Sequence, residues 1–423
     1  MRVLVISHNV FDYSTSMGKT LSKYFESFQV NEVAQLYIHP EAPKAMPFCH
    51  KYYRVTDGEV IKSIINRNNI GKIFDEDNLQ DGKISKINTE TNAVYQKGRR
   101  RTPFIYFARD FIWKIGNWNN KVLDDWVLNF DPDLIFLASG DYKFIYDIAL
   151  YVSNICNKPL VTACFDDYYL FNQNEKRFLG KLRQKSFMKV VNRAMERSSC
   201  IITICEPMAK AYASLFSKPV HVLYTSAEQE TEQLENHGQR LAYFGSLGLE
   251  RDDQLIFIGK KFMSITGRTI DVYSSEMRPE ILKKLVPQNG IEFHHSVSAE
   301  EMKQIYKSCM GVIHTESFDN NISSRTRFSI STKIAESLAS GPCLFAFGPK
   351  GIASIDYLID TNSAIVVTDP RQLEEGLRLL FNRENRCKVI NNARITAQNN
   401  HNSLINGQKL RQWFSLAIDS FID

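Results

Sequence analysis

Short apolar runs alternate with amphipathic stretches along the whole chain, and this alternation predicts most of its secondary structure. In the first half, six runs have the length and composition of buried strands, at residues 3–7, 33–38, 134–139, 160–165, 200–205 and 220–225. Six more follow in the second half, at residues 241–246, 270–275, 291–294, 311–316, 343–348 and 364–368. Amphipathic segments such as residues 181–196 separate the runs and predict helices. This order is typical of α/β proteins with parallel sheets.

A polar segment at residues 226–240 divides the alternation into two halves. It holds four glutamates and lacks a strand pattern, so it predicts an interdomain linker. We expect one Rossmann-like domain over residues 1–226, a second over residues 227–402, and a helix at residues 403–423 that packs back on the first domain. The ligand is expected in the cleft that faces the carboxyl ends of the strands. Residues 57–103 are rich in Asn, Lys and Asp and predict a mobile insertion.

Composition narrows the class of protein. The chain has 423 residues, which suits two domains, and its 43% hydrophobic and 23% charged residues suit a soluble globular protein. The N-terminal apolar stretch is too short for a signal peptide, and no run of 18 apolar residues predicts a membrane span. Eight scattered cysteines, several within apolar runs, predict reduced core thiols and no zinc site. A cytoplasmic protein is expected, and a net charge of +5 does not by itself indicate nucleic acid.

The segment at residues 328–341, FSISTKIAESLASG, carries the most specific chemistry. Ser331 and Thr332 are good N-cap residues before a helical pattern that ends near Gly341. A helix N-terminus offers unpaired N–H groups and partial positive charge, which suit a diphosphate. Lys333 adds a full charge in a turn where basic residues are usually unfavourable, which an anion there would explain. Glu336, one turn further in, could accept hydrogen bonds from a ribose diol, and a surface glutamate favoured by the helix dipole is the alternative.

The second half resembles the donor domain of the family 4, or group 1, glycosyltransferases. In that family a helical glutamate is followed by a turn of small residues and a strand, as in ESLASG at residues 336–341. The fuller string HTESFD…RFSISTKIAESLASG is similar to a subgroup associated with bacterial surface polysaccharides. The resemblance covers most of the chain and is weakest over residues 50–110. It implies a GT-B fold with an acceptor-side first domain, and it implies that Glu336 binds the ribose and the helix start binds the diphosphate.

The chain departs from the family pattern in the donor domain. The usual first glutamate, eight residues before Glu336, is replaced by Phe328, and Glu316 is our candidate for its role. The family also places a basic pair five residues apart after a strand. The matching positions here are Ser246 and Arg251. Arg251 therefore keeps one of the two positive charges that would compensate the leaving diphosphate. The alternative is that Arg251 is only a solvated charge in a loop.

Three further positions follow from the resemblance to the donor site. His295 and Val297 match the region whose backbone reads the nucleotide base, although a histidine at a strand end is more often structural. Gly18 fits a glycine that lies close to the donor phosphates, or it simply opens a helix. The triplet Gly18-Lys19-Thr20 is not a Walker A motif, because the glycine that such a motif needs at position 13 is a tyrosine.

Asp166 is the candidate on the acceptor side. It follows a buried strand in the string LVTACFDDYYLF, where the family places a polar residue near the transferred sugar. A carboxylate there could hold a sugar hydroxyl or stabilise positive charge at the anomeric carbon. A helix N-cap is the alternative.

Residues 97–118, KGRRRTPFIYFARDFIWKIGNW, interleave basic and aromatic side chains. Such a pattern suits the interface of an anionic membrane. Single-stranded nucleic acid also binds such patterns, but no RNA-binding motif accompanies this one and we expect no nucleic-acid partner. A buried helix with a basic edge is the bland alternative. The basic run at residues 176–193 gives weak support to peripheral docking at the inner face of the membrane.

Together these features predict a metal-independent, retaining glycosyltransferase. It would move a sugar from a nucleotide-diphosphate donor to a glycan or lipid-linked acceptor in the biosynthesis of a surface polysaccharide. Retention and the absence of a metal or other cofactor are implied by the resemblance alone. A sugar-nucleotide epimerase on the same fold and a non-catalytic nucleotide-sugar-binding protein are the alternatives.

Overall fold

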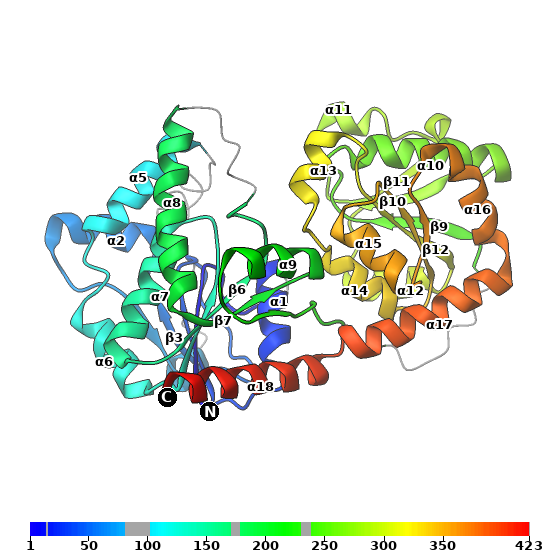
Figure 1. Ribbon diagram of the computed structural model, residues 1–423. Helices are drawn as coiled ribbons and strands as arrows, with labels where there is room; N and C mark the ends of the chain where they lie inside the picture. The colour runs from blue at the N-terminus through cyan, green and yellow to red at the C-terminus, as the bar shows by residue number, and fades with distance from the viewer. Residues whose placement is uncertain (14–15, 81–101, 171–177, 230–237, 423) are drawn as a thin grey trace. The chain divides into compact units, whose positions relative to one another are not determined.

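Each half of the chain builds its own β-sheet with helices packed on it (Figure 1). The computed structural model describes residues 1–13, 16–80, 102–170, 178–229 and 238–422. One unit comprises Met1–Tyr224 together with Ser403–Asp423, and the other comprises Thr225–Asn402. The predicted class, α/β with two Rossmann-like halves, is confirmed.

The first sheet has eight strands in the order β4-β3-β2-β1-β5-β6-β7-β8. The antiparallel pair β3–β4 stands at one edge, and the other neighbouring strands pair in parallel. Their bounds are Val3–Ser7 (β1), Val33–Tyr37 (β2), Lys51–Arg54 (β3), Lys72–Phe74 (β4), Leu134–Ala138 (β5), Leu160–Cys164 (β6), Ser198–Thr203 (β7) and Val220–Val222 (β8).

The helices of the first unit connect these strands and cover them. They are α1 (Ser16–Phe25), α2 (Asp57–Asn66), α3 (Glu76–Gln80), α5 (Pro103–Ile115), α6 (Lys121–Phe130), α7 (Lys143–Cys156), α8 (Phe178–Arg197), α9 (Glu206–Leu215) and α18 (Ser403–Ile422). All five residues of β1, β2, β5 and β6 are buried, as expected for parallel strands covered on both faces.

Helix α18 belongs to the core of the first unit although it follows the second unit in sequence. Its Leu410 and Phe414 are fully buried in the same apolar cluster as Val3 and Val5 of β1. Arg411 adds a bidentate ion pair with Glu32, at 3.0 and 2.7 Å. The last 21 residues are therefore an integral layer of the first unit.

The second sheet has six parallel strands in the order β11-β10-β9-β12-β13-β14. Their bounds are Arg240–Phe244 (β9), Ile270–Ser274 (β10), Ile291–His295 (β11), Cys309–Thr315 (β12), Cys343–Phe347 (β13) and Ile365–Val367 (β14). The α-helices of this unit are α10 (Arg251–Thr266), α11 (Pro279–Leu282), α12 (Ala299–Tyr306), α13 (Asn320–Thr326), α14 (Thr332–Ala339), α15 (Ala353–Asp360), α16 (Leu373–Phe381) and α17 (Arg383–Asn400). Two short 3-10 turns lie at Pro287–Asn289 and Pro370–Gln372.

Both sheets reverse their strand order once, at positions that matter for ligand binding. In the first sheet the chain runs outward from β1 to β4 and then returns to β5, on the other side of β1. In the second sheet it runs outward from β9 to β11 and returns to β12, on the other side of β9. Such switch points open a crevice at the carboxyl ends of the two central strands, where α/β proteins bind their ligands.

The twelve predicted strands are all present, with ends that move by no more than about three residues. The prediction of a mobile insertion at residues 57–103 is wrong for the part that the structure describes. Thr56 caps α2 through a capping box with Glu59, and β4 pairs with β3 at the edge of the first sheet. Residues 81–101 lie outside the described residues.

Candidate functional site

A cavity of about 190 Å³ lies at the β9–β12 switch point of the second unit. Its walls come from the end of β9 and the loop after it, from β12, and from the start of α14. Five of the residues that the sequence singled out for a donor line it together: Ser246, Arg251, Ser331, Thr332 and Lys333. These residues are up to 87 positions apart in the chain, so the fold itself assembles them.

The N-terminus of α14 forms one wall of this cavity. Ser331 is the N-cap, and its Oγ accepts the N–H of Lys333 at 3.3 Å. No acidic residue occupies the first turn. Lys333 is exposed and makes no ion pair with any residue that the structure describes. A cation at this position opposes the helix dipole, so the wall presents positive charge to the cavity.

The N-terminus of α10 meets the same cavity from the β9 side. Leu249 and Glu250 precede it with φ values of 63° and 58°, in the left-handed region that non-glycine residues rarely adopt. Glu250 is the N-cap residue but makes no side-chain cap; its carboxylate instead accepts the Ser317 hydroxyl at 2.7 Å. The first N–H groups of α10 are thus left without a side-chain cap, and backbone strain of this kind clusters at ligand sites.

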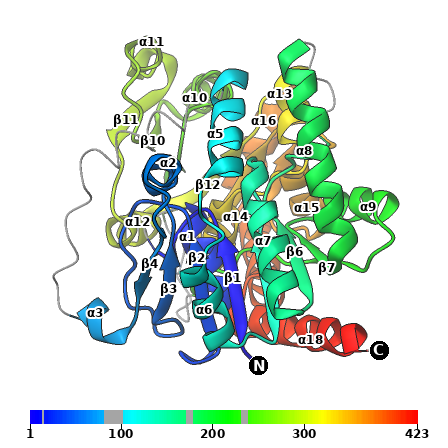
Figure 2. The ribbon, with the colours of Figure 1, turned by 90° about the vertical axis from the view of Figure 1, so that its left-hand side faces the viewer.

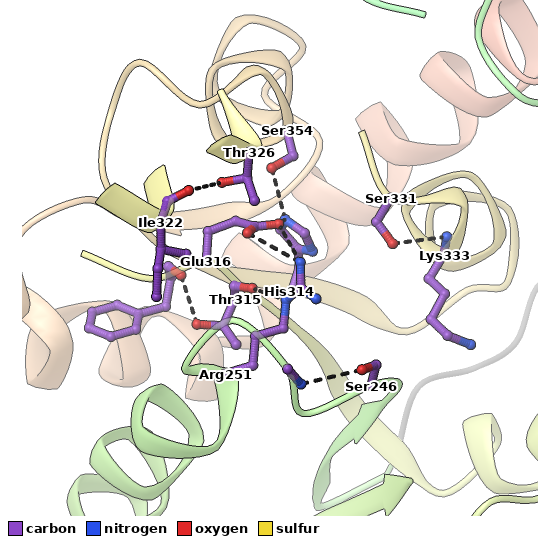
Figure 3. A network of polar contacts seen from close by, with 12 residues as sticks. Ser246, Arg251, His314, Thr315, Glu316, Ile322, Thr326, Ser331, Lys333 and Ser354 are labelled. Carbon is purple, nitrogen blue, oxygen red and sulfur yellow. Dashed lines mark hydrogen bonds and ion pairs between the residues drawn. The ribbon is translucent and has the colours of Figure 1, made fainter. Parts of the chain in front are cut away.

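Arg251, the first residue of α10, forms a partly buried ion pair with Glu316, as Figure 3 shows. Its Nη2 lies 3.2 Å from both carboxylate oxygens, and its Nε donates to the Thr315 carbonyl at 3.2 Å. Glu316 is only 2% exposed and does not line the cavity, whereas Arg251 does. Burial raises the pKa of Glu316, and the guanidinium opposes that rise. The carboxylate therefore lies behind Arg251 and holds it at the wall.

His314 completes this buried group. Its Nε2 lies 3.1 Å from the Ser354 hydroxyl and 3.6 Å from a Glu316 oxygen. Burial, with a smaller contribution from Arg251, lowers the pKa of His314 to about 3. The imidazole is neutral near pH 7, so it adds no charge to the cavity wall.

Glu336 lies beside the cavity on α14. It is three residues after Lys333 and four after Thr332, so it shares their face of the helix. It is half-buried. Burial raises the pKa of Tyr306, a residue of the cavity wall, and the negative charge of Glu336 raises it further. A ribose attached to a diphosphate at the start of α14 would lie within reach of this side chain.

The structure does not bring the two predicted base contacts to the cavity wall. His295 is exposed at the end of β11. Val297 packs behind the wall, against the apolar cluster that contains Phe244 and Tyr306, both of which line the cavity. Their assignment to the base stays a prediction.

Phe328, which replaces the family glutamate, does not line the cavity. The Arg327 guanidinium lies 4.4 Å from the centre of its ring, and the Arg327 carbonyl accepts the N–H of Ala353 at 2.7 Å. These contacts tie the segment before α14 to the start of α15.

A second cavity, of about 300 Å³, lies at the β1–β5 switch point of the first unit. The His8 ring, at the end of β1, stacks on Tyr142 at 5.7 Å and 20°. The Asp141 carboxylate accepts a hydrogen bond from the Tyr106 hydroxyl at 2.6 Å. Among the described lining residues, Asp141 is the one carboxylate, and there is no Lys or Arg. Most of the described lining residues of this cavity are polar.

Gly18 and Asp166 belong to the first unit and are described with this cavity. Gly18 lies in the first turn of α1, whose Met17 and Leu21 line the cavity. Asp166 is exposed in the loop after β6, two residues before Tyr168, which is also a lining residue. The Asp166 carboxylate accepts the N–H of Asp167, so it also stabilises the turn. Both assignments stay predictions.

Two absences hold for the part of the chain that the structure describes. It contains no helix long and apolar enough to cross a membrane. It also contains no group of three or more His, Cys, Asp and Glu side chains arranged to hold a metal ion.

The sequence did not identify Tyr243, Tyr306 and His314, which line the cavity of the second unit. His314 had a signal, since it is a polar residue within the buried run GVIHTE. The two tyrosines had none, because aromatic residues in such runs usually belong to the core.

Comparisons with known proteins agree with this architecture. No protein-family model matches the chain, and no curated protein matches it in sequence. Among solved structures, Anabaena HepE, determined in complex with UDP-glucose, has a TM-score of 0.59 at 11% identity, over 98% of this chain and 99% of its own. A glycosyltransferase from Rickettsia africae has a TM-score of 0.57 at 10% identity, over 99% and 98%. The UDP-forming trehalose-phosphate synthase of Burkholderia xenovorans has a TM-score of 0.56 at 8% identity, over 97% and 99%.

These likenesses extend over nearly the full length of both chains and show that this protein has the GT-B fold of glycosyltransferases. At identities of 8–11% they show the fold and leave the reaction to be argued from the site.

Proposed function

We propose that the protein is a glycosyltransferase that binds the diphosphate of a nucleotide-sugar donor in the cavity of its second unit. One observation carries the proposal. At the β9–β12 switch point, two helix N-termini, Arg251 and Lys333 meet around a cavity that has no carboxylate among its described lining residues. Such a surface favours a dianionic group over any neutral one.

Uridine diphosphate sugars are the first donors to test. HepE was solved with UDP-glucose, and the Burkholderia synthase is described as UDP-forming. The volume of about 190 Å³ is below that of a complete site for a small molecule, roughly 300–1,000 Å³. We therefore assign the cavity to the phosphates, and we place the ribose at Glu336 beside it.

Each residue then has a defined role in the transfer. The bond between the anomeric carbon and the diphosphate oxygen breaks, and the electron pair leaves with the diphosphate. Arg251, Lys333 and the helix N–H groups stabilise this developing charge. The acceptor oxygen forms the new bond to the anomeric carbon and gives its proton to the leaving diphosphate. Glu316 does not touch the sugar in this scheme; it positions Arg251.

The remaining features of the reaction are part of the same proposal. The acceptor is a glycan or lipid-linked sugar of a surface polysaccharide, and we assign its binding to the first unit, with Gly18 and Asp166 as candidate residues. The reaction retains the anomeric configuration and needs no metal, as the family resemblance implies, and the chain's own cations compensate the diphosphate. The enzyme works in the cytoplasm at the inner face of the membrane, with contact in the region of residues 97–118.

A thermal-shift screen tests the donor site. The full chain is heated with UDP-, GDP-, ADP- and TDP-sugars, and one class is expected to raise its melting temperature. Glu336→Ala should lose most of that shift, whereas Glu292→Ala, a change of an exposed glutamate on the edge strand β11, should keep it. If no nucleotide sugar stabilises the wild type, the proposed function fails. If Glu336→Ala is stabilised equally, only the ribose assignment fails.

Turnover separates the proposed reaction from its alternatives. A transferase releases nucleoside diphosphate from the stabilising donor, slowly with water and faster with an acceptor extract. An epimerase would convert the donor sugar without that release, and a binding protein would do neither. Activity that persists in EDTA supports metal-independent transfer, and the anomeric proton of the product reports retention by NMR.

A further inference from the structure

Helix α5 presents apolar side chains on two opposite faces. Tyr106 and Trp113 face the core and are 7% and 1% exposed. Phe104, Phe111 and Ile115 are 77%, 61% and 48% exposed. Their spacing of seven and four residues places them on one stripe of the helix. Within the described part of the chain, one face of α5 thus lacks a packing partner.

The first two turns of α8 expose a second group of apolar side chains, and the same helix carries basic residues next to them. Phe178, Leu179 and Leu182 are 75%, 52% and 46% exposed. Between residues 178 and 193, α8 has five basic residues and no acidic one. Lys181 and Lys185 are exposed, and they recur at the helical spacing of four residues.

The two helices are fixed against each other (Figures 1 and 2). The Arg183 guanidinium of α8 stacks 3.4 Å from the centre of the Tyr106 ring of α5. Arg183 also donates to the Asp141 carbonyl at 2.5 Å, while the Tyr106 hydroxyl donates to the Asp141 carboxylate. On its inner face, α5 is anchored by Arg109, which pairs with the buried Asp57 at 3.0 Å. The exposed side chains therefore stand on a rigid support.

We call the exposed apolar side chains of these helices the α5–α8 surface: Phe104, Phe111, Ile115, Phe178, Leu179 and Leu182. They are six of the 18 large apolar side chains that the described residues expose, although the two helices hold only 13 and 20 residues. Scattered apolar side chains on a surface need no explanation, but their concentration on two helices that contact each other favours an interaction surface.

We propose that the α5–α8 surface docks on a bilayer that contains anionic phospholipid. Aromatic and aliphatic side chains flanked by lysines are what the boundary between headgroups and acyl chains accommodates. The excess of positive charge on α8 complements anionic headgroups, and each lysine near such a surface strengthens binding. The apolar side chains supply the anchor, and Lys181, Lys185 and Lys189 supply the attraction.

This inference extends the membrane contact of the proposed function and moves its centre. The sequence placed that contact at residues 97–118, of which residues 97–101 lie outside the described residues. In the structure the buried face of α5 is taken up by the core, and the start of α8 contributes half of the exposed apolar group and most of the charge. A transferase held in this way would meet a lipid-linked acceptor at the membrane surface.

Co-sedimentation of the full chain with vesicles tests the inference. Vesicles of phosphatidylcholine with phosphatidylglycerol should bind the wild type, vesicles of phosphatidylcholine alone should bind it much less, and salt should weaken the binding. Phe178→Ser/Leu179→Ser should reduce binding, and Lys181→Glu/Lys185→Glu should reduce it at least about tenfold. The matched controls on other helices of the same unit, Leu128→Ser and Lys121→Glu/Lys210→Glu, should bind like the wild type.

Three outcomes would overturn the inference. The wild type could fail to bind anionic vesicles, or both double variants could bind as well as their controls. A wild type that ignores vesicles but forms a dimer, which Phe178→Ser/Leu179→Ser dissociates, would make the surface an interface between copies. The donor thermal shift is measured on the same variants and should not change, so a failure of membrane docking is distinguishable from a failure of the donor site.

Discussion

Replacing Arg251 by alanine separates its structural role from its role toward the donor. The change removes both contacts of its Nη2 with Glu316 and leaves a carboxylate that is 2% exposed without its cation. The carboxyl can always escape this state by taking up a proton. From the unperturbed pKa of 4.5, protonation at pH 7 costs about 3.4 kcal/mol, since each pH unit is worth ~1.36 kcal/mol. The destabilisation that arises from Glu316 is therefore at most about 3.4 kcal/mol at pH 7.

The sign of the pH dependence follows from the same argument. In Arg251→Ala the folded pKa of Glu316 is raised above 4.5, because burial raises it and the opposing guanidinium is gone. The folded state then binds more protons than the unfolded state, so stability falls as the pH rises through this window. The part of the stability difference between variant and wild type that arises from Glu316 should shrink to below about 1 kcal/mol at pH 5. Urea unfolding at pH 5 and pH 7 measures it.

Donor binding should follow a different pattern. Loss of one charge-assisted contact to the diphosphate costs about 1.5–3 kcal/mol, which is roughly tenfold to a hundredfold in Kd. Arg251→Ala/Glu316→Gln removes the unpaired carboxylate and should recover stability but not affinity. Arg383→Ala is the matched control, because Arg383 also occupies the first position of a helix of this unit but is exposed and lies away from the cavity lining. If the double variant regains donor affinity together with stability, Arg251 only supports the fold and the proposed charge compensation is wrong.

Three further predictions concern the same unit. Lys333→Ala should stabilise the ligand-free protein by about 0.3–1 kcal/mol, because a cation opposes the helix dipole at the start of α14. The same change should weaken donor binding. Thermal melts with and without donor measure both effects. His314→Gln should remove part of the acid sensitivity. The folded pKa of His314 is about 3, so the unfolded state binds more protons between pH 6.5 and pH 4.5. The free energy of unfolding of the wild type should therefore fall by about 2–3 kcal/mol over this range through this group. Equal acid dependence of the wild type and His314→Gln in urea unfolding would contradict this. Gly259→Ala should destabilise the unit by about 1–3 kcal/mol despite alanine's better helix propensity, because its Cβ would lie 2.6 Å from the Gly290 carbonyl oxygen; Ser264→Ala on the same helix should leave urea unfolding unchanged.

Periodicity alone predicted the fold well, because parallel strands buried on both faces read as uninterrupted apolar runs. Each of the twelve predicted strands is present. The strands that it missed, β3 and β4, stand at the edge of the first sheet, where fewer apolar residues are needed. Lys51 at the start of β3, and Lys72 and Ile73 of β4, are exposed. The signal that would have helped was local: Thr56 followed by Glu59 is a capping box, and it marks the start of α2.

The site was predictable only in part, for a physical reason. Ser331, Thr332 and Lys333 are neighbours in sequence, and helix-start chemistry identifies them without any fold. The pairing of Arg251 with Glu316 depends on β12 returning beside β9, so that the loop after one strand meets the end of the other. Sequence reasoning could choose both residues through a family resemblance, but it could not show that one holds the other.

The two switch-point cavities have different linings although the two sheets share the same kind of strand-order reversal. Each sheet opens a crevice where its strand order reverses, so the fold by itself would serve either half equally well. The lining decides between them. The cavity of the second unit has Arg251 and Lys333 and no carboxylate among its described lining residues, and Glu316 is buried behind its wall. The cavity of the first unit has Asp141 and neither lysine nor arginine among its described lining residues, so it offers a diphosphate less charge compensation. In the proposed function, a neutral sugar hydroxyl suits the cavity of the first unit and an anionic leaving group suits the cavity of the second unit, and this difference in charge supports the proposed acceptor and donor sides.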